Sequence, residues 1–565
     1  MFWKFRPIDP SLARALAGEL KTPLKVGEFF SARGFKTVPE INVFKAGALS
    51  GLMDPETMPG VKKAVKILVK AHQEKKVVAI AGDYDVDGLT ATALMYRVLT
   101  ALGYTVITRV PNRLTEGYGL SGLAVTELAK RGAGLLVTVD CGVSDNAAVK
   151  VAKDLGLPVI VTDHHQLPPV LPAALAIVNP HLGGGWEHYP LAGVGVAFVV
   201  VWALKKALEK EGLKTDFSLV EHLSLVALGT VADLVPLKGA NRILVLNGLN
   251  FLARSTWPGL AALRRKALKT PDFVSTRDIG FRLAPRLNAA GRLGETETAL
   301  KLLLATEPKE AEDLAERLEK LNRDRLKNQN ALLEEALESL ANEGPRYSDR
   351  RTIVLAGDGW PKGLLGLAAT RVAEMTQRAT IIFGVDGDIA VGSGRGVKGF
   401  NLFAALEPLR DLCISMGGHS QAAGLRLKTS KLARFRAAFE RSAYNQDPPD
   451  SEIQLDVDLL VDDLKELNVI APALAEMEPF GQANPPPVAA LKKLQVLEAA
   501  PTKSGGDRHL SLRLFDGAEK VSLIGFDLVH RLPEIGSRLD VALILETEKF
   551  GRRELNWRLL DFQDP

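Results

Sequence analysis

The chain has 565 residues, several times the length of one ordinary domain, which favours two to four domains. Lys and Arg number 71 and Asp and Glu 67, so the formal net charge of +4 neither demands nor excludes a nucleic-acid partner. The two cysteines, Cys141 and Cys413, lack the paired spacing of a zinc site or a disulfide framework, which favours a reducing, cytoplasmic compartment.

Residues 1–45 form an N-terminal segment without the apolar region and small-residue cleavage site of a signal peptide. The longest apolar stretch, Leu191–Leu204, has about 14 residues, whereas a bilayer-spanning helix needs about 20. We therefore expect a buried core helix there and no association with a membrane.

Residues 46–305 begin with short Val/Ile-rich runs that alternate with longer segments of helical spacing. Val77–Ala81 precedes Leu89–Leu102, and Leu135–Val139 precedes Asn146–Leu155. Strands that alternate with helices predict βαβ units and a mostly parallel sheet. Ligands bind beyond the carboxyl ends of such strands, so the residues that follow each run are candidates for a site.

Acidic and imidazole side chains follow these runs. Asp83, Asp85 and Asp87 recur at a spacing of two, which in an extended segment would crowd like charges on one side unless a cation offset them. Later runs are followed by Asp140, Asp163, His164, His165 and Asp233. Such a carboxylate-rich set suits Mn²⁺ or Mg²⁺, and two such ions can promote phosphoester hydrolysis.

The alternative for any single Asp after a strand is a helix N-cap, which is equally well supported, but it does not explain the whole set. Cys141, next to Asp140, is better explained as a small buried apolar residue than as a soft metal ligand.

The remaining chain divides into three parts. Residues 306–345 have leucines at helical spacing and end at Gly344-Pro345, which predicts a long connecting helix. Residues 346–446 contain strand-like runs of a smaller α/β unit, and a Pro-containing linker follows. Residues 450–565 contain short strands without intervening helices, which predicts a small antiparallel barrel.

Several segments now carry a family resemblance. Asp163-His164-His165 with the Asp83–Asp87 run resembles the DHH phosphoesterase superfamily, and Gly417–Gly424 resembles the GGH signature of its DHHA1 domain. Within that superfamily the chain is most similar to the RecJ family of exonucleases, in the segments Pro111–Arg113, Gly117–Leu120, Leu228–Leu237, Pro285–Leu293 and Glu478–Gly481. The resemblance implies an α/β protein: a parallel-sheet DHH domain, a long helix, a smaller α/β DHHA1 domain and a C-terminal OB-like β-barrel.

The resemblance also implies roles for individual residues. Two ions, Mn²⁺ or Mg²⁺, would be held by Asp85, Asp87, Asp140, His164 and Asp233, with Asp140 shared between them. Asp83, Asp140, His165 and His419 would serve catalysis, and Asp163 would orient a neighbouring imidazole. The DNA and its 5′ phosphate would be held by Arg113, Arg286, Asn288, Arg292, Ser393 and Arg395.

Each of these assignments has an alternative. Taken singly, an Arg is more often a solvated surface charge, and His419 could cap a glycine turn. Gly396 stands where the family motif often has Ser, which puts one hydroxyl contact in doubt. In the barrel, basic residues interleave with the aromatic residues Phe550 and Trp557, which favours a DNA-binding groove over a solvated strand face.

The implied function is a single-stranded-DNA-specific 5′-to-3′ exonuclease that releases 5′-mononucleotides in recombination and repair. The implied partners are a single-strand DNA-binding protein and a RecQ-type helicase, and the chain is expected to be a monomer. One alternative is a phosphodiesterase of very short oligonucleotides or cyclic dinucleotides, which the barrel disfavours. Another is an inactive scaffold, which the complete set of acids disfavours.

Overall fold

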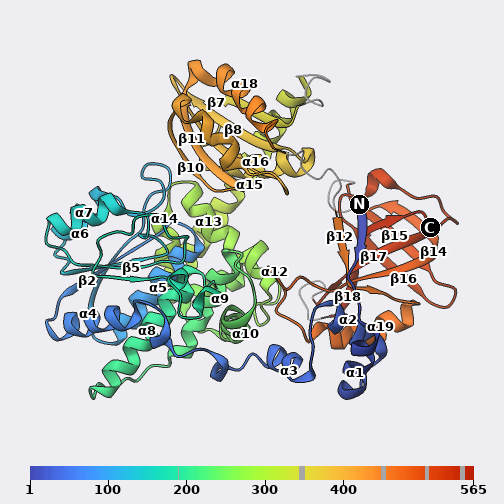
Figure 1. Ribbon diagram of the computed structural model, residues 1–565, viewed down its shortest axis with the longest axis horizontal. Helices are drawn as coiled ribbons and strands as arrows, with labels where there is room; N and C mark the ends of the chain where they lie inside the picture. The colour runs from blue at the N-terminus through green and yellow to red at the C-terminus, as the bar shows by residue number, and fades with distance from the viewer. Residues whose placement is uncertain (189, 343–349, 447–453, 503–507, 548–553) are drawn as a thin grey trace.

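The computed structural model describes residues 1–188, 190–342, 350–446, 454–502, 508–547 and 554–565. Figure 1 shows a DHH-like domain at the left, a smaller DHHA1-like domain above it and a barrel domain at the right. The helix α15 (Pro308–Asn342) connects the first two. The predicted fold class, with a parallel sheet, a second α/β unit and a closed barrel, is confirmed.

The DHH-like domain is built on a parallel sheet in the order β3-β2-β4-β5-β6. The strands are β2 (Val77–Gly82), β3 (Thr105–Arg109), β4 (Leu135–Val139), β5 (Val159–Thr162) and β6 (Ala176–Val178). Every residue of β4 and β5 is buried, as expected for strands that are covered on both faces.

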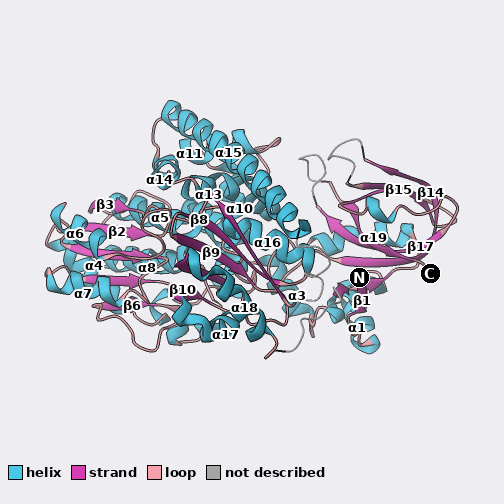
Figure 2. Ribbon diagram, turned by 90° about the horizontal axis from the view of Figure 1, so that it is seen from above, coloured by secondary structure: helices cyan, strands magenta, loops and turns pink. Residues whose placement is uncertain are grey.

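Helices cover both faces of this sheet (Figure 1), and Figure 2 shows its strands in magenta among the cyan helices from above. On one face, alternate residues such as Val78, Ile80 and Val137 pack with α4 (Val61–Gln73), α5 (Val86–Ala101) and α8 (Gly193–Lys210). On the other, Ala79, Leu136 and Val161 pack with α6 (Gly122–Lys130) and α7 (Asn146–Asp154). Because strand side chains alternate, each strand contributes to both cores.

The register of the sheet brings the carboxyl ends of three strands level. Gly82 pairs with Val139, and Val139 pairs with Thr162. The next residues along the chain, Asp83, Asp140 and Asp163, therefore leave adjacent strands at the same edge. This alignment gathers acids that are far apart in the sequence.

A helical layer follows the sheet and leads to the connecting helix. Its members are α9 (Leu223–Ala232), α10 (Gly239–Arg254), α11 (Pro258–Ala267), α12 (Thr276–Asp278), the π-helical turn η6 (Ile279–Leu283), α13 (Ala284–Arg292) and α14 (Thr296–Leu304). The buried leucines of α15 pack first against this layer and then, through Leu332 and Leu340, against the DHHA1-like domain. The long helix thus shares the cores of both domains.

The DHHA1-like domain has a sheet in the order β10-β11-β9-β8-β7, in which only the β7–β8 pair is parallel. Its strands are β7 (Thr352–Asp358), β8 (Ala379–Asp386), β9 (Ile389–Arg395), β10 (Cys413–Gly418) and β11 (Ala422–Lys428). Its helices are α16 (Leu365–Thr376), α17 (Leu402–Leu406) and α18 (Leu432–Ala443).

The barrel domain closes through a β14–β17 pairing. Its strands are β13 (Leu459–Leu460), β14 (Val488–Pro501), β15 (Leu510–Phe515), β16 (Lys520–Gly525), β17 (Arg538–Glu546) and β18 (Asn556–Gln563), with α19 (Leu464–Ala475) packed on them. The β16–β18 contact is parallel, so the barrel is not antiparallel throughout. Figure 1 shows the N-terminus beside it.

The N-terminal segment packs on the barrel domain, more than 400 residues away along the chain. β1 (Phe2–Phe5) pairs in parallel with β12 (Gln454–Val457). The helices α1 (Pro10–Leu20), α2 (Leu24–Ala32) and α3 (Val38–Ala46) contribute buried residues, including Phe29 and Phe30, to the core of the barrel domain. Sequence analysis gave this segment no partner.

Among the described residues, no helix combines the length and apolar character needed to cross a bilayer. The apolar stretch from Leu191 lies in α8, whose residues from Gly193 to Val201 are all buried. It forms a core helix, as expected.

A buried arginine fastens the barrel domain to the DHH-like domain. Arg242 on α10, which is 2% exposed, donates from Nη1 to the carbonyl oxygen of Met477 (3.0 Å) and from Nη2 to that of Glu478 (2.6 Å). Its Nε donates to the carbonyl oxygen of Phe44 (2.7 Å), in the N-terminal segment. One side chain therefore satisfies three backbone carbonyls, one in the N-terminal segment and two that precede the barrel strand β14.

The variant Arg242→Met should retain the aliphatic bulk but leave those carbonyls without their donor. We expect a loss of about 3 kcal/mol of stability at this junction, seen as a lower Tm in calorimetry and faster proteolytic release of the barrel domain. Arg265→Met is the control, because Arg265 lies on the surface, where it pairs with the exposed Glu312 (3.3 Å). An Arg242→Met variant with unchanged Tm and proteolysis would contradict the fastening role.

Candidate active site

The Asp83–Asp87 run is not an extended segment, so that expectation is wrong. β2 ends at Gly82 and α5 begins at Val86, with Asp85 as its N-cap. Asp85 Oδ1 accepts hydrogen bonds from the N–H groups of Asp87 (3.0 Å) and Gly88 (3.1 Å). A short Asp side chain satisfies the free N–H groups of a helix start, which ends the strand. The three acids therefore converge through a turn.

Asp87 is buried against the start of α8. Its Oδ2 accepts from Gly193 N (2.6 Å) and its Oδ1 from Val194 N (2.8 Å). These are free N–H groups at the positive end of a helix, which favour a carboxylate. The apolar helix α8 therefore also fixes the orientation of Asp87.

Asp140 occupies a backbone conformation that few non-glycine residues adopt, with φ of 59°. Its side chain lies so close to Gly193 that a Cβ on that glycine would come within 2.5 Å of Asp140 Cβ. The absence of a side chain at Gly193 is therefore required for this placement. Backbone strain of this kind is concentrated at functional sites.

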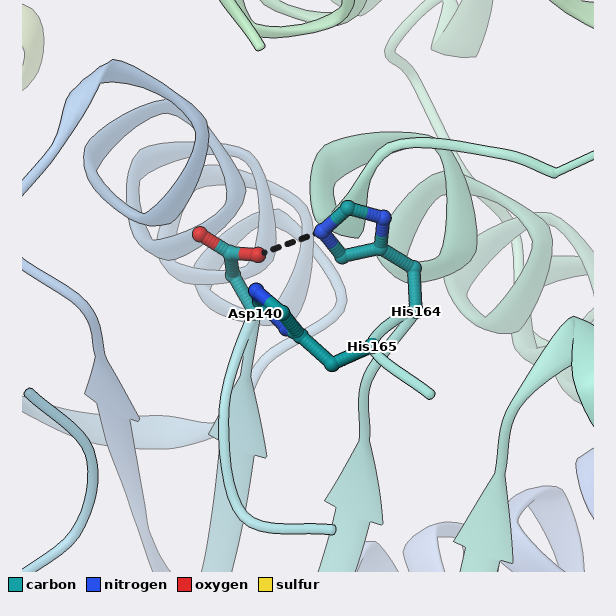
Figure 3. A group of neighbouring side chains, drawn as sticks. All are labelled: Asp140, His164 and His165. Atoms are coloured by element: carbon teal, nitrogen blue, oxygen red, sulfur yellow. Dashed lines mark ion pairs between the residues drawn. The ribbon is translucent and has the colours of Figure 1, made fainter. Parts of the chain in front are cut away.

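Three buried atoms at this edge have no hydrogen-bond partner in the part of the chain that the structure describes: Asp83 Oδ1, Asp140 Oδ1 and His164 Nε2. His164 Nε2 lies 3.2 Å from Asp140 Oδ1, 3.7 Å from Asp233 Oδ2 and 3.8 Å from Asp87 Oδ2 (Figure 3). Buried polar atoms are normally satisfied. Here they point at one another, which fits a site for cations.

The structure forms three overlapping groups whose potential ligand atoms lie within 4.8 Å of one another. They are Asp83 with Asp85 and Asp140, Asp87 with His164 and Asp233, and Asp140 with His164 and His165. Asp140 is common to two of them. Oxygen ligands with one or two imidazoles fit Mn²⁺ or Mg²⁺, so the donor set agrees with the predicted cofactor.

Without a cation these groups resist ionisation. Burial is the larger cause, and the charge of Asp85 the next, of the rise of the pKa of Asp87 to about 7. Burial, followed by the charge of Asp87, raises the pKa of Asp233 to about 8 and that of Asp140 well above its ordinary range. Burial and the charge of His165 lower the pKa of His164 to about 4, which leaves it neutral, the form that binds metals.

Asp163 orients the second imidazole. Its Oδ1 lies 2.8 Å from His165 Nδ1 and accepts from the N–H groups of His164 (2.7 Å) and His165 (3.1 Å). Burial alone would lower the pKa of His165, but the hydrogen bond and charge of Asp163 outweigh it and raise that pKa to about 9. Tyr118 lies in the segment Gly117–Leu120, to which the sequence gave a family resemblance but no role, and its Oη lies 3.1 Å from His165 Nδ1.

Four arginines gather beside the acids: Arg113, Arg292, Arg325 and Arg395. Burial, followed by the charges of the other three, lowers the pKa of Arg292 to about 9. Within the described residues none of the four has a carboxylate at ion-pair distance. Arg325 comes from α15, where its regular helical context gave no signal in the sequence. Half-buried cations that gather without acids suit the binding of an anion.

Tyr84 links the arginines to the acids. The Cζ of Arg113 lies 4.7 Å from the centre of the Tyr84 ring. Burial and the charge of Asp83 raise the pKa of Tyr84 to about 12, while Arg113 opposes that rise. The anion site and the acid cluster thus share one side chain. Among the other predicted contacts, Ser393 Oγ accepts from Arg395 Nη1 (3.1 Å).

The remaining predicted site residues are less directly connected. Arg286 Nε donates to Glu319 Oε2 (2.6 Å), so its charge is already paired, and Asn288 lies half-buried on α13. His419 is exposed beyond β10, and its Nδ1 accepts from Gln421 N (3.3 Å), as expected of a His in a glycine turn. Their roles toward DNA stay predictions.

The basic and aromatic set of the barrel is only partly as expected. Trp557 is buried in the core, because it occupies an inward position of β18, so its use in base stacking is wrong. Arg513 pairs with Glu498 (2.9 Å), and Arg558 with Glu546 (2.7 Å). Lys503, Lys549, Phe550, Arg552 and Arg553 lie outside the described residues.

Cys141 is a small buried residue, as the sequence predicted. It is buried, and its Sγ faces the carbonyl oxygen of Ala81 at 3.8 Å.

Metal-free protein should lose stability as the pH rises from about 4 to 8. Asp87 and Asp233 have raised pKa values of about 7 and 8 against an ordinary 3.8, so the folded chain holds protons that the unfolded chain releases. Their stabilisation is complete below pH 4 and is lost as the pH passes 7 to 8. Tm measured across this range in EDTA should fall, and Mn²⁺ should remove much of the fall.

The variant Asp233→Asn should make the EDTA curve flatter, whereas Asp154→Asn, at an exposed position, should leave it unchanged. Curves of equal slope with and without Mn²⁺ would contradict a cation site.

Comparison with known proteins covers nearly the whole chain. The model of the DHH family, N-terminal domain, matches residues 77–230, the DHHA1 domain residues 349–445, and the RecJ OB domain residues 455–561. The chain resembles the proteins named single-stranded-DNA-specific exonuclease RecJ of Bacillus subtilis (33% identity, covering 98% of this chain and 70% of the relative) and Escherichia coli (36%, covering 94% of each).

Comparison with solved structures indicates the same family. The crystal structure of RecJ from Thermus thermophilus in complex with Mn²⁺ matches with a TM-score of 0.83 at 29% identity, covering 100% of this chain and 80% of that one. The Mg²⁺ complex of the same protein matches with a TM-score of 0.78 at 29% identity, covering 100% and 78%. By sequence, domain order and fold, the chain belongs to the RecJ family.

Proposed function

We propose that the chain is a metal-dependent exonuclease that hydrolyses the phosphodiester bonds of single-stranded DNA. One observation carries this proposal: the acid cluster and the arginine cluster meet at Tyr84. The four arginines have no acidic partners among the described residues. The acid cluster suits divalent cations, and the arginine cluster suits a phosphate. The relatives named as single-stranded-DNA-specific exonucleases agree with it.

Different residues of the chain would hold the cations and the reacting phosphoryl group. Asp83, Asp85 and Asp140 would hold one Mn²⁺ or Mg²⁺, and Asp87, His164 and Asp233 a second, with Asp140 between them. Bound ions supply Lewis-acid stabilisation of the negative charge on the reacting phosphoryl group. His165, kept protonated by Asp163, is placed to bind an oxygen of that group. His419 would approach the same group from the DHHA1-like domain.

The arginine cluster sets the polarity. A terminal 5′ phosphate held by Arg113, Arg292 and Arg395 places the adjoining phosphodiester beside the acids, so the strand is cut from its 5′ end. Release of 5′-mononucleotides follows, because the two clusters adjoin through a single side chain. Arg286, Asn288 and Ser393 would support the strand nearby.

A phosphodiesterase of dinucleotides is the weaker candidate. The closed barrel offers a surface that so short a substrate does not need. An inactive scaffold is disfavoured because it gains nothing from buried acids whose ionisation is opposed.

The cellular setting belongs to the proposal too. We place the chain in the cytoplasm, as a monomer that acts in DNA recombination and repair. A single-strand DNA-binding protein would present the strand, and a RecQ-type helicase would unwind duplexes ahead of it.

One assay tests the proposal. End-labelled single-stranded, duplex and dinucleotide substrates, each with a 5′ phosphate or 5′ hydroxyl, are incubated with Mn²⁺, Mg²⁺ or EDTA. We expect mononucleotides from 5′-phosphorylated single strands with metal and no products in EDTA. Preference for the dinucleotide, or cleavage in EDTA, would reject the function.

Asp140→Asn should abolish hydrolysis while retaining DNA binding. Asn tolerates the left-handed backbone at this position, so the fold is kept while the shared charge is lost. We expect a rate at least 10³-fold lower, on the order of what removing one strong electrostatic contributor costs, and weaker Mn²⁺ binding in calorimetry. Asp154→Asn serves as the matched control. Turnover near the unmodified rate would reject the bridging assignment.

Arg395→Ala should weaken binding of 5′-phosphorylated single strands more than of 5′-hydroxyl ones. A charge-assisted contact to phosphate is worth about 1.5–3 kcal/mol, or roughly 10- to 150-fold in Kd. Fluorescence anisotropy in EDTA at low salt measures both strands. Arg426→Ala, on the exposed face of the next strand, is the control. Equal losses of affinity for the two strand types would remove Arg395 from the phosphate site.

A further inference from the structure

The loop between β3 and α6 reaches both parts of the candidate active site. It contributes Arg113 to the arginine cluster, where the Cζ of Arg113 lies 4.7 Å from the centre of the Tyr84 ring. Further along, the same loop contributes Tyr118, which is 50% exposed and lies beside His165. Arg113 binds phosphate in the proposed function, which leaves Tyr118 without a role.

Hydrogen bonds fasten this loop at both ends. Asn112 Nδ2 donates to the carbonyl oxygen of Gly294 (3.1 Å). At the other end, Asp145 Oδ2 accepts from the N–H group of Leu120 (2.7 Å). The position of Tyr118 is therefore set before a substrate arrives, and order that exists in advance costs no entropy when the substrate binds.

Two glycines give the loop the shape that brings Tyr118 to the site. Gly117 and Gly119, on either side of the tyrosine, have φ of 81° and 86°, a region that other residues rarely adopt. A Cβ on Gly119 would also lie 2.8 Å from Asp145 Oδ1. The resulting turn places the Tyr118 ring edge-on to that of His165, with their centres 5.4 Å apart.

The hydroxyl of Tyr118 contacts two residues of the site. Its Oη lies 3.1 Å from His165 Nδ1 and 3.4 Å from His165 Nε2, so it faces the edge of the ring between the two nitrogens. The same Oη lies 3.4 Å from the carbonyl oxygen of Asp140. One hydroxyl therefore bridges the imidazole and the backbone of the shared acid.

The surroundings set the direction of these hydrogen bonds. Asp163 Oδ1 lies 2.8 Å from His165 Nδ1 and also accepts from two backbone N–H groups, so it is an acceptor and Nδ1 carries a hydrogen. Tyr118 Oη can then only accept from that nitrogen. Its own hydrogen is free to bond the carbonyl oxygen of Asp140, so both contacts form at once.

His165 needs a contact of this kind. Its side chain is 44% exposed, and its hydrogen bond with Asp163 is made at one ring nitrogen. A ring that is held by one hydrogen bond can swing about it, whereas a contact from another direction restrains the swing. Placement matters, because a shift of about 1 Å near the reacting atoms can cost on the order of 10²-fold in rate.

We propose that Tyr118 is a positioning residue: its hydroxyl, together with Asp163, holds the imidazole of His165 in the orientation in which Nε2 meets the reacting phosphoryl group. The inference rests on the proposed function and deepens it. Tyr118 acts through His165, so its loss should slow the chemical step and leave binding of the strand unchanged.

The test separates the hydroxyl from the ring. kcat and KM for 5′-phosphorylated single strands are measured with Mn²⁺ for the full chain and its Tyr118→Phe, Tyr118→Ala and His165→Ala variants, and for Tyr118→Phe combined with His165→Ala. Kd for the same strand in EDTA and Kd for Mn²⁺ by calorimetry are measured in parallel. Tyr444→Phe, at a similarly exposed tyrosine (55%) directly after α18, is the matched control.

We expect Tyr118→Phe to lower kcat by roughly 5- to 100-fold, between the loss of one hydrogen bond and the misplacement of a catalytic group. KM and both Kd values should stay the same, because the ring and the metal ligands are kept. Tyr118→Ala should lower kcat at least as much. In the His165→Ala background, Tyr118→Phe should lower kcat no further, because the hydroxyl acts through the imidazole. Tyr444→Phe should match the unmodified chain.

Four results would overturn the proposal. If Tyr118→Phe keeps the unmodified kcat, its hydroxyl positions nothing. If only KM or the Kd for DNA changes, Tyr118 is a contact of the strand. If Mn²⁺ binds more weakly in step with the loss of kcat, the hydroxyl acts on the cations through Asp140. If Tyr118→Phe lowers kcat further in the His165→Ala background, it acts apart from His165.

Each of these results leaves the exonuclease proposal standing. An unmodified chain that does not cut single strands rejects that proposal first.

Discussion

Burial of negative charge at one edge of a parallel sheet is the constraint on which the rest of this structure depends. Strand register brings the residues after β2, β4 and β5 level, and the turn into α5 adds two further acids. Like charges in a low-dielectric interior repel strongly. Helix N-termini and buried backbone N–H groups offset part of the repulsion, and protons held at raised pKa values offset more of it in the metal-free chain. Cations held by these acids would take the place of those protons.

The arginine cluster is subject to the same constraint, because it gathers positive charges in the interior as the acids gather negative ones. Four guanidinium groups gather without carboxylate partners in the described chain, although acids lie just beyond Tyr84. If the two clusters paired directly, each would neutralise the other and neither would bind a ligand. Tyr84 keeps them adjacent and separate, so that a phosphate-bearing strand can complete both at once.

The sequence predicted what depends on local pattern or on chain order. Alternating strands and helices gave the parallel sheet, and acids after those strands gave the edge at which they meet. The prediction that Asp83–Asp87 is extended was wrong, because Asp85 caps the start of a helix and thereby ends the strand. The inward position of Trp557 depends on the register of β18, which a short aromatic-basic run does not reveal.

Contacts between distant segments could not be predicted. Arg325 lies on a polar position of a long amphipathic helix, and only the approach of α13 shows its environment. Tyr118 meets His165, which lies 47 residues further along the chain. Arg242 caps carbonyls more than 230 residues away, a distance at which no local pattern carries information.

The pairing of the N-terminal segment with the barrel domain has a consequence for synthesis of the chain. β12 and the barrel strands that cover Phe29 and Phe30 leave the ribosome more than 400 residues after β1 and α1–α3. At usual elongation rates that interval is roughly 20–100 s. Throughout it an aromatic cluster has no native partner, so the nascent chain is a natural client for chaperones before the molecule is complete.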